Sequence, residues 1–257
     1  MESTKYKLTI GTPCLSSDKN VLNRGKIIGR ELGRLETITC LDAGCGYGAY
    51  IGLLADRCSR VFGVDANESY LQEAKSQSKN FENVSFAQMS LESMALCRRS
   101  FDFIICIETL EHVKNDHAAI GEFRRLLKPN GRIVLSVPYK WFPFETHGIR
   151  LGGKVTSSPF GLGFPLLTFL PANIRKYFAT ARVYSRRDLV YLFNENGFRV
   201  EEISFLMPGL DIFERKSRSK FLVKLFRNIM YLFQKAFECK WGSTIVLIAS
   251  PKERTEI

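Results

Sequence analysis

The sequence predicts an α/β protein, a doubly wound and largely parallel sheet that carries a lid and a basic helical insertion. Short apolar runs alternate with amphipathic segments over residues 20–138, which is the pattern of successive strand–helix–strand units. The apolar run at 101–107 is typical of a strand covered on both faces. A chain of 257 residues with 45% hydrophobic residues can also bury a full core without a metal or disulfide.

The elements follow in order along the chain. We expect strands at 38–41, 61–64, 84–87, 101–107 and 132–137, with helices at 49–57, 69–79 and 117–127. The last of these helices stops at 128–131 (KPNG), where Asn and Gly tolerate a positive φ and predict a turn. Residues 139–180 are rich in Pro, Gly and aromatic residues without a clean period and predict a lid. A helix at 186–196, ended by Gly197, and strands near 198–205 and 243–249 complete the pattern.

Composition excludes several classes of protein. No stretch approaches the ~18–20 apolar residues of a membrane-spanning helix, and no secretory signal is visible near the start. The seven cysteines form no CxxC pair and no zinc-like cluster, which favours a reduced, cytoplasmic protein. The net charge of +11 is uneven, because residues 139–257 hold 19 Lys and Arg against 10 Asp and Glu. This asymmetry indicates an anionic partner, whether a membrane surface, an acidic substrate or nucleic acid.

A glycine-rich turn after the first strand indicates a nucleotide-like ligand. Residues 40–48 read CLDAGCGYG, and a second strand ends at Asp65, whose carboxylate can accept both hydroxyls of a ribose. The glycines also satisfy a relaxed dinucleotide pattern, so a nicotinamide-dependent oxidoreductase is one alternative. Asp42 favours another ligand, because a carboxylate there repels a pyrophosphate but holds an α-ammonium group. S-adenosylmethionine has such an ammonium, a sulfonium and no phosphate.

Four motifs in order, LDAGCGYG, VDAN, FDFIICIETLEHV and LLKPNGRIVLSVP, resemble the class I S-adenosylmethionine-dependent methyltransferases. The resemblance covers roughly residues 25–138 and implies a Rossmann-like sheet of seven strands whose last strand, at 243–249, is antiparallel. It implies that the methionine part lies on the turn, that the ribose binds Asp65, and that Ser90 stands where an acidic residue usually contacts adenine. The cofactor-binding residues implied in this way are Asp42, Gly44, Cys45, Gly46, Asp65, Ala66, Ser90, Leu91 and Ile107.

Two segments at the carboxyl ends of strands carry the candidate acceptor chemistry. Residues 108–112 (ETLEH) resemble the ExxEH run of ubiquinone-biosynthesis O-methyltransferases, in which such side chains can hold a divalent cation; we expect Glu108 and His112 to shape the acceptor pocket without a metal. Residues 138–148 resemble a P-x-x-x-x-P-x-E-x-H segment found with small hydrophobic, lipid-like or glycan acceptors. There His147 is the candidate general base, oriented by Glu145. The absence of Asn/Asp-Pro-Pro-Tyr and Pro-Cys runs after the fourth strand makes nucleic acid an unlikely acceptor.

The segment at 215–240 carries eight basic residues, one acidic residue and an apolar stripe at helical spacing. A basic amphipathic helix of this kind can lie on a membrane, or it can pack on the sheet or form a lid. Residues 160–170 (FGLGFPLLTFL) add a second apolar patch that is too short to span a bilayer. The sequence leaves these alternatives open.

The combined expectation is a single methyltransferase domain over 1–257. Its cofactor-binding core is at about 25–138, its lid at about 139–183, and the sheet is completed by 184–257 with the basic insertion. We expect methyl transfer from S-adenosylmethionine to a small or lipid-like acceptor, with oxygen as the favoured target. A cofactor-binding sensor or scaffold without catalysis is the main alternative. We expect a cytoplasmic location, with a peripheral contact at the inner membrane surface as the alternative.

Overall fold

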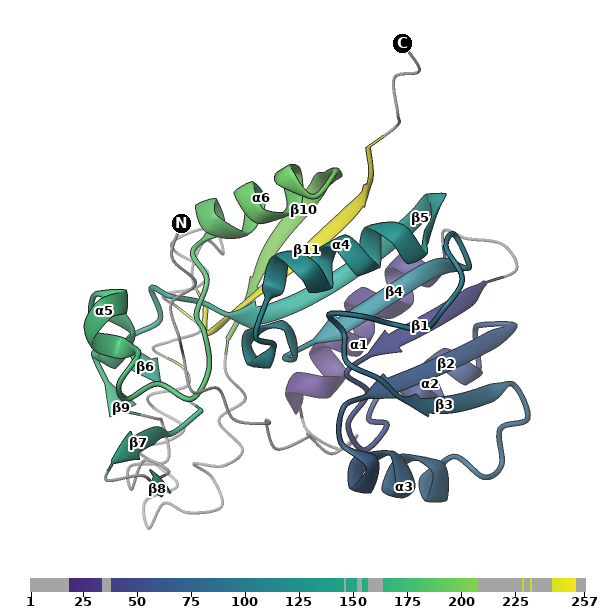
Figure 1. The fold of residues 1–257 in the computed structure, drawn as a ribbon, viewed down its shortest axis with the longest axis horizontal. Coiled ribbons are helices and arrows are strands. Elements are labelled where there is room, and N and C mark those ends of the chain that lie inside the picture. Colours follow the sequence, from purple (N-terminus) through teal and green to yellow (C-terminus); the bar gives the residue numbers. More distant parts are fainter. Residues whose placement is uncertain are drawn as a thin grey trace.

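A seven-stranded mixed sheet forms the centre of the molecule, with strand order β10-β11-β5-β4-β1-β2-β3 (Figure 1). The computed structural model describes residues 19–33, 38–145, 147–151, 154–156, 164–207 and 242–252, together with residues 228 and 232. The strands are β1 (Thr39–Ala43), β2 (Arg60–Asp65), β3 (Val84–Gln88), β4 (Phe101–Ile107), β5 (Leu127–Pro138), β10 (Phe198–Leu206) and β11 (Thr244–Pro251).

The sheet confirms the predicted fold class. The first five strands are parallel, since β1 pairs with β2 and β4, and the outer pairs β2–β3 and β4–β5 have the same orientation. Strand β11 is antiparallel to both of its neighbours, β5 and β10. The last strand therefore inserts between two earlier ones in the opposite direction, as the resemblance implied.

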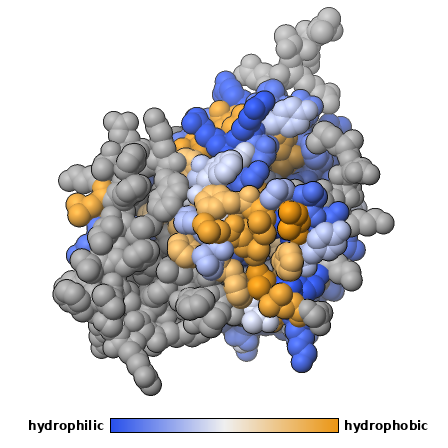
Figure 2. Space-filling model, turned by 90° about the vertical axis from the view of Figure 1, so that its left-hand side faces the viewer, coloured by the Kyte–Doolittle hydropathy of each residue, from blue (hydrophilic) through white to orange (hydrophobic). Residues whose placement is uncertain are grey.

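The lid follows directly after β5 and lies beyond the carboxyl end of the sheet (Figure 1). Its described parts are the strand pairs β6 (Phe144–Glu145) with β9 (Phe164–Pro165) and β7 (Ile149–Leu151) with β8 (Lys154–Thr156), the 3-10 helix η2 (Leu167–Phe169) and the short helix α5 (Ala172–Arg175). The backbone N–H of Lys140 donates to the carbonyl of Tyr184, which closes the base of the lid. Figure 2 looks onto this side of the molecule.

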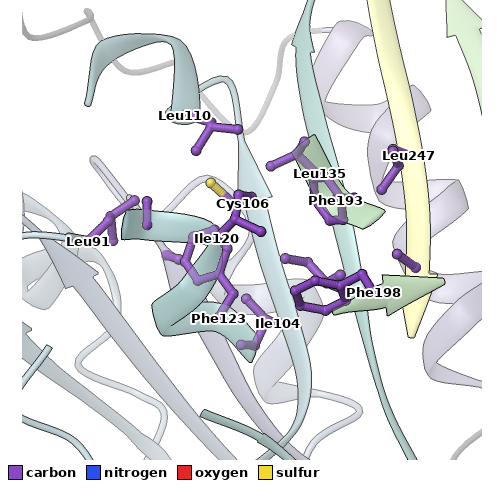
Figure 3. Close-up of a cluster of buried hydrophobic side chains, with 14 of the residues drawn as sticks. Leu91, Ile104, Cys106, Leu110, Ile120, Phe123, Leu135, Phe193, Phe198 and Leu247 are labelled. Carbon is purple, nitrogen blue, oxygen red and sulfur yellow. The ribbon is translucent and has the colours of Figure 1, made fainter. Parts of the chain in front are cut away.

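Helices cover both faces of the sheet. On one face α1 (Lys19–Leu32) and α2 (Ile51–Ala55) pack with Phe103, Ile105 and Val134. On the other face α4 (Asp116–Leu126) and α6 (Arg186–Glu195) supply Phe123 and Phe193 to a larger core with Leu135 and Phe198 (Figure 3). Helix α3 (Glu68–Gln77) packs beside β2 and β3. Side chains of consecutive strand residues point to opposite faces, so each strand contributes to both cores.

Three features differ from the sequence-based expectation. Helix α1 was not predicted, although Val21, Ile28 and Leu32 are buried at helical spacing. Helix α2 is shorter than 49–57 because a series of turns precedes it. Strand β5 begins at Leu127 and includes the expected turn at 128–131. Gly131 permits this pairing, since a Cβ there would lie 3.0 Å from the carbonyl oxygen of Asp102 on β4.

The predicted basic insertion at 215–240 lies outside the described residues, apart from positions 228 and 232. Within the part of the chain that the structure describes, no helix is long and apolar enough to cross a membrane.

Candidate functional site

The backbone of the turn between β1 and α2 lies close to the end of β2 and to the residues that follow β4. Gly44 has a φ of +83° and Gly46 a φ of +53°, a region that favours glycine. A Cβ on Gly44 would run into the side chain of Thr109, which follows β4. The N–H groups of Gly44 and Cys45 both donate to the carbonyl of Val64, at 2.8 and 2.9 Å. The turn is therefore fixed to the end of β2, and it has no room for a side chain at Gly44.

Asp42 lies at the end of β1 with its carboxylate buried. The residue is 2% exposed, and its Oδ2 has no hydrogen-bond partner among the described residues. Burial raises the pKa of Asp42 to about 8, and the nearby charge of Asp65 adds to the shift. A buried carboxylate without a donor is costly unless a ligand supplies one. A cationic group fits this position, as expected for the ammonium of S-adenosylmethionine.

Asp65 ends β2 and is oriented by two backbone donors. The N–H of Gly46 donates to its Oδ2 at 3.0 Å and the N–H of Asn67 to its Oδ1 at 2.9 Å. These bonds hold the carboxylate against the glycine turn, and each oxygen keeps a further lone pair for a ligand hydroxyl. The geometry suits the predicted ribose contact.

A cavity of about 500 Å³ joins these features to the candidate acceptor residues. All nine predicted cofactor-binding residues line it, as do three of the four predicted catalytic residues: Asp42, Gly44, Cys45, Gly46, Asp65, Ala66, Ser90, Leu91, Ile107, Glu108, His112 and His147. Glu145 is absent from the wall because it lies behind His147 and is 1% exposed. The structure thus brings together residues that are more than 100 positions apart in the chain.

The region near Ser90 contains an acidic residue that the motif alignment did not assign. Glu92 lines the cavity two positions after Ser90, and its backbone N–H donates to the Ser90 hydroxyl at 3.3 Å. Its Oε1 also accepts from the N–H of Asn115. Glu92 therefore adds a carboxylate to the cavity wall two residues after Ser90.

Glu108 is held in the cavity wall by contacts from two elements. Its backbone is left-handed, with a φ of +50°. Its Oε1 accepts from the Ser136 hydroxyl at 2.9 Å and forms an ion pair with Arg24 of α1 at 3.1 Å. Arg24 is buried, and its Nη2 also donates to the Thr244 hydroxyl of β11 at 3.3 Å. This network fastens α1 over the cavity and uses the Glu108 carboxylate to do so.

His147 lies between two buried carboxylates. Its Nδ1 is 3.4 Å from Glu145 Oε1, which also accepts the His147 backbone N–H at 3.1 Å. Its Nε2 is 3.6 Å from Glu111 Oε1, and the same oxygen is 3.9 Å from His112 Nε2. Glu111 is fully buried in the 3-10 helix η1 (Leu110–His112). Glu111 thus extends the predicted Glu145–His147 pair. It belongs to the ETLEH run at 108–112, but the sequence did not predict it as a site residue.

This arrangement sets the protonation of the cluster. Burial lowers the pKa of His147, but the contacts with Glu111 and Glu145 outweigh it and raise the pKa to about 10. Burial raises the pKa of Glu111 to about 7, with His147 opposing the shift. At neutral pH His147 is therefore an imidazolium, which cannot accept a proton until it has released one. The raised pKa of His147 therefore counts against its predicted role as a general base at neutral pH.

Glu111, His112 and His147 offer atoms within 4.8 Å of one another, a group that could hold a metal ion. The expected ExxEH set differs, because Glu108 is held by Arg24 and Ser136 instead. A metal would have to displace a proton from His147. Both ring nitrogens of an imidazolium carry protons, so neither offers a lone pair to a metal ion. The expectation that no metal is needed stays a prediction.

Other cavity residues had no motif to identify them. Asn20 and Arg24 come from α1, which was not predicted, and Tyr70 comes from α3. The signal for α1 was the spacing of its buried residues, but the inward direction of an arginine on that helix depends on the tertiary fold. Thr109 was quoted within ETLEH, and only its contact with Gly44 gives it a structural role.

Comparison with known proteins supports the same interpretation. Residues 41–135 match a family model described as a methyltransferase domain. The ubiquinone biosynthesis O-methyltransferase of Alkalilimnicola ehrlichii is 36% identical over 107 residues, which cover 41% of this chain and 43% of that protein. The matched region thus spans less than half the length of this curated relative.

Solved structures extend the likeness of the fold to most of the chain. The putative methyltransferase of Haloferax volcanii, in complex with the Trm112 methyltransferase activator, has a TM-score of 0.62 at 17% identity, with coverage of 94% of this chain and 96% of that one. An S-adenosylmethionine-dependent methyltransferase from Mesorhizobium loti has a TM-score of 0.57 at 16% identity, covering 87% and 96%. Residues 41–135 are thus similar to methyltransferase domains, and most of the chain shares its fold with solved structures that include an S-adenosylmethionine-dependent methyltransferase.

Proposed function

We propose that this protein transfers a methyl group from S-adenosylmethionine to an oxygen atom of a small or lipid-like acceptor. The observation that carries the proposal is that Asp42, Asp65, His112 and His147 all line one cavity. A cofactor site alone would not need a histidine–carboxylate cluster in its wall. The O-methyltransferase relatives support oxygen as the target.

The residues of the cavity divide into binding and acceptor groups. Asp42 pairs with the ammonium of the cofactor, Asp65 accepts from the ribose hydroxyls, and Ile107 provides apolar surface near the sulfonium. When bound, the cofactor supplies a methyl group that is already activated for displacement. The chain therefore has to align the acceptor oxygen with that carbon and exclude water. The fastening of α1 by Arg24 serves the exclusion of water.

A hydroxyl acceptor has to lose a proton, and the cluster around His147 is where we place its uptake. The proposal keeps His147, oriented by Glu145, as the candidate base, and adds that Glu111 sets its charge. His112 lines the same wall, and its ring centroid is 5.5 Å from that of His147. Because Glu111 has a pKa of about 7, it is the member of the cluster that changes charge near neutral pH.

Radiolabelled cofactor tests the proposal directly. The protein is incubated with methyl-labelled S-adenosylmethionine and a fractionated cell extract, and label is sorted into small-molecule, lipid, glycan, protein and nucleic-acid fractions. We expect label in the small-molecule or lipid fraction, with inhibition by S-adenosylhomocysteine. Binding of the cofactor without label transfer would favour the sensor or scaffold, and label in nucleic acid would contradict the acceptor class.

A peripheral contact with an anionic membrane is the finer part of the proposal. The sequence supports this contact through the basic segment 215–240, which lies outside the described residues apart from positions 228 and 232. A cytoplasmic location with such a contact suits a lipid-like acceptor, since the acceptor then resides where the protein docks. Co-sedimentation with anionic vesicles tests the contact.

A further inference from the structure

Exposed apolar side chains are concentrated on the lid. Ten large hydrophobic residues are exposed in the described part of the chain, and seven of these belong to the lid: Trp141, Leu151, Val155, Leu166, Phe169, Ile174 and Tyr177. Figure 2 looks at this side of the molecule, where hydrophobic surface gathers in one area bordered by hydrophilic side chains. Scattered apolar residues need no explanation, but such a concentration indicates an interaction surface. We call Trp141, Leu166, Phe169, Ile174 and Tyr177 the lid face.

The charge around the lid face has one sign. Residues 139–184 contain six Lys and Arg and a single acidic residue, Glu145. Glu145 is 1% exposed, so it contributes nothing to the outer surface. The ammonium of Lys140 lies 5.4 Å from the ring centroid of Trp141, and that of Lys176 lies 5.3 Å from the ring of Tyr177. The lid face therefore presents aromatic and aliphatic side chains with cations beside them.

The local backbone holds this face in place. The N–H of Leu166 donates to the carbonyl of Pro143 at 2.6 Å, and the hydroxyl of Thr168 donates to the carbonyl of Phe142 at 2.6 Å. Leu166 is 62% exposed and has a φ of +60°, which is strained for a leucine. An apolar side chain kept outward at a backbone cost indicates a surface role.

A second hollow, separate from the cofactor cavity, lies beside the lid face. Its volume is about 630 Å³, and it is lined by Tyr139 and Trp141 from the lid and by residues of the α6 region: Ser185, Arg186, Arg187, Val190, Tyr191 and Asn194. Arg186 and Arg187 are exposed, and the guanidinium group suits phosphate oxygens. Trp141 belongs to both the hollow and the lid face, so one ligand surface can contact the two together.

We propose that the lid face docks on an anionic phospholipid membrane, with one phosphodiester headgroup held in the hollow by Arg186 and Arg187. Apolar side chains enter the acyl boundary, and the aromatic residues and lysines lie at headgroup level. The charge selects this occupant, because a second copy of the same face would bring like charges together. The inference rests on the proposed function only for the lipid-like class of acceptor.

Docking at this face has a consequence for the acceptor. The lid that carries the face also carries Glu145 and His147, and the Thr180 hydroxyl donates to the carbonyl of His147 at 3.0 Å. The docked surface and the candidate acceptor residues therefore belong to the same segment of the chain, residues 139–183. A lipid-like acceptor leaving the bilayer would meet the lid before it reached the cavity.

Vesicle flotation with the full chain tests the proposal. Vesicles of phosphatidylcholine alone are compared with vesicles in which about a third of the lipid is phosphatidylglycerol, at low and high salt. We expect binding to the anionic vesicles that weakens at high salt. Leu166→Asn removes apolar surface and suits a positive φ, and Arg186→Gln with Arg187→Gln removes the headgroup cations. Each variant is expected to lose binding by about fivefold or more.

Matched controls keep the result specific. Leu22→Asn changes a leucine that is 56% exposed on α1, and Arg98→Gln with Arg99→Gln changes an exposed arginine pair just before the amino end of β4. Both controls are expected to float as the parent does. Equal loss in a control variant, or flotation that ignores lipid charge, overturns the proposal. So does a concentration-dependent dimer that the Leu166→Asn variant abolishes.

The outcome is separable from that of methyl transfer. Calorimetry with S-adenosylmethionine is carried out on the same variants, which lie outside the cofactor cavity and should keep the parent affinity. Loss of flotation with intact cofactor binding supports the docking site. Absence of flotation in a protein that methylates an acceptor rejects the docking site and the peripheral membrane contact, and leaves the proposed methyl transfer standing.

Discussion

Asp42 is the residue on which the predicted preference for S-adenosylmethionine over a dinucleotide depends. Its carboxylate is buried at the end of β1, and its Oδ2 lacks a partner among the described residues. Burial makes ionisation of this carboxyl group unfavourable in the folded protein without ligand. A cationic ligand removes the cost, whereas a pyrophosphate would increase it.

Asp42→Asn should weaken S-adenosylmethionine binding by about ten- to a hundredfold, because a charged hydrogen bond is replaced by a neutral one. Calorimetry measures the change, and Asp56→Asn, an exposed residue after α2, is the matched control.

The affinity of the parent protein for S-adenosylmethionine should also fall by up to about tenfold per pH unit below 8, since the ligand binds the ionised carboxylate and the pKa of Asp42 is about 8. A parent affinity that is flat between pH 6 and 7.5 would contradict this account.

His147 is the residue at which sequence pattern and geometry lead to different chemistry. Its position beside Glu145 agrees with the expected pair, but Glu111 on the other ring nitrogen keeps it protonated. A residue in this state contributes positive charge to the cavity wall. It acts as a base only where the pH is high enough to deprotonate it or where the bound acceptor lowers its pKa.

His147→Gln should lower methyl transfer by about a hundredfold while leaving cofactor affinity within about twofold. His117→Gln, an exposed histidine in α4, should have no effect. If His147 is the base, the parent rate rises with pH towards the His147 pKa of about 10, and this rise is absent in the variant. A variant within a few-fold of the parent at every pH would remove His147 from the mechanism.

At the scale of elements, the β1–α2 turn is the part of the cavity wall with the tightest backbone constraint. Gly44 has a positive φ and lies against Thr109, so two independent constraints demand glycine there. The turn in turn positions the N–H of Gly46 on Asp65. The spacing of the glycines is therefore a consequence of the contact between the turn and the ends of β2 and β4.

Gly44→Ala should abolish measurable cofactor binding and lower the melting temperature, because the added methyl displaces Thr109 and strains the backbone. Gly29→Ala is the matched change within α1, where a Cβ meets nothing within 4 Å. That variant should gain about 0.5–1 kcal/mol of stability, since alanine favours a helix over glycine. Thermal unfolding and calorimetry on both variants check the pair. Equal behaviour of the two would show that the turn has more room than described.

At the scale of the whole molecule, three buried groups make stability depend on pH. Asp42 and Glu111 have pKa values of about 8 and about 7, above those of exposed carboxyls, and His147 has a pKa of about 10, above that of an exposed histidine. In each case the folded protein binds a proton that the unfolded chain has already released. The stability this contributes is present at the lower pH and is lost as pH rises through the folded pKa.

The cofactor-free protein should therefore become less stable from pH 6 to pH 9, with the melting temperature falling by roughly 5–10 °C per unit where two of the three groups contribute together. Asp42→Asn should flatten the slope below pH 8, since its amide does not titrate. Differential scanning fluorimetry across this range measures both. A melting temperature that rises with pH in the parent would mean that these groups are not protonated as their burial indicates.

The comparison of sequence and structure differs between the core and the lid. Strand β4 was predicted with its observed bounds, because a continuous apolar run has one stable solution inside a doubly wound sheet. Strand β5 was predicted to start five residues late, because Asn130 and Gly131 are turn residues locally but pair with β4 in the fold. The lid had no periodicity to predict, and its short strand pairs depend on contacts with each other.

The candidate site shows the same division. The resemblance of the motifs predicted the residues of the glycine turn and the end of β2 as cofactor-binding residues, and the structure places them in the wall of one cavity. Glu111, Arg24 and Glu92 were not chosen, because a buried carboxylate or an inward arginine is recognised only by what surrounds it.

The sequence by itself predicted the alternation of strands and helices, because local propensity is encoded residue by residue, and the resemblance of its motifs to a known family implied the antiparallel last strand and the cofactor. Tertiary structure alone decided the charge of His147, the fastening of α1 over the cavity and the gathering of apolar side chains on the lid. Those properties depend on distances between segments far apart in the chain, and electrostatic and hydrophobic contacts act across such distances only after folding.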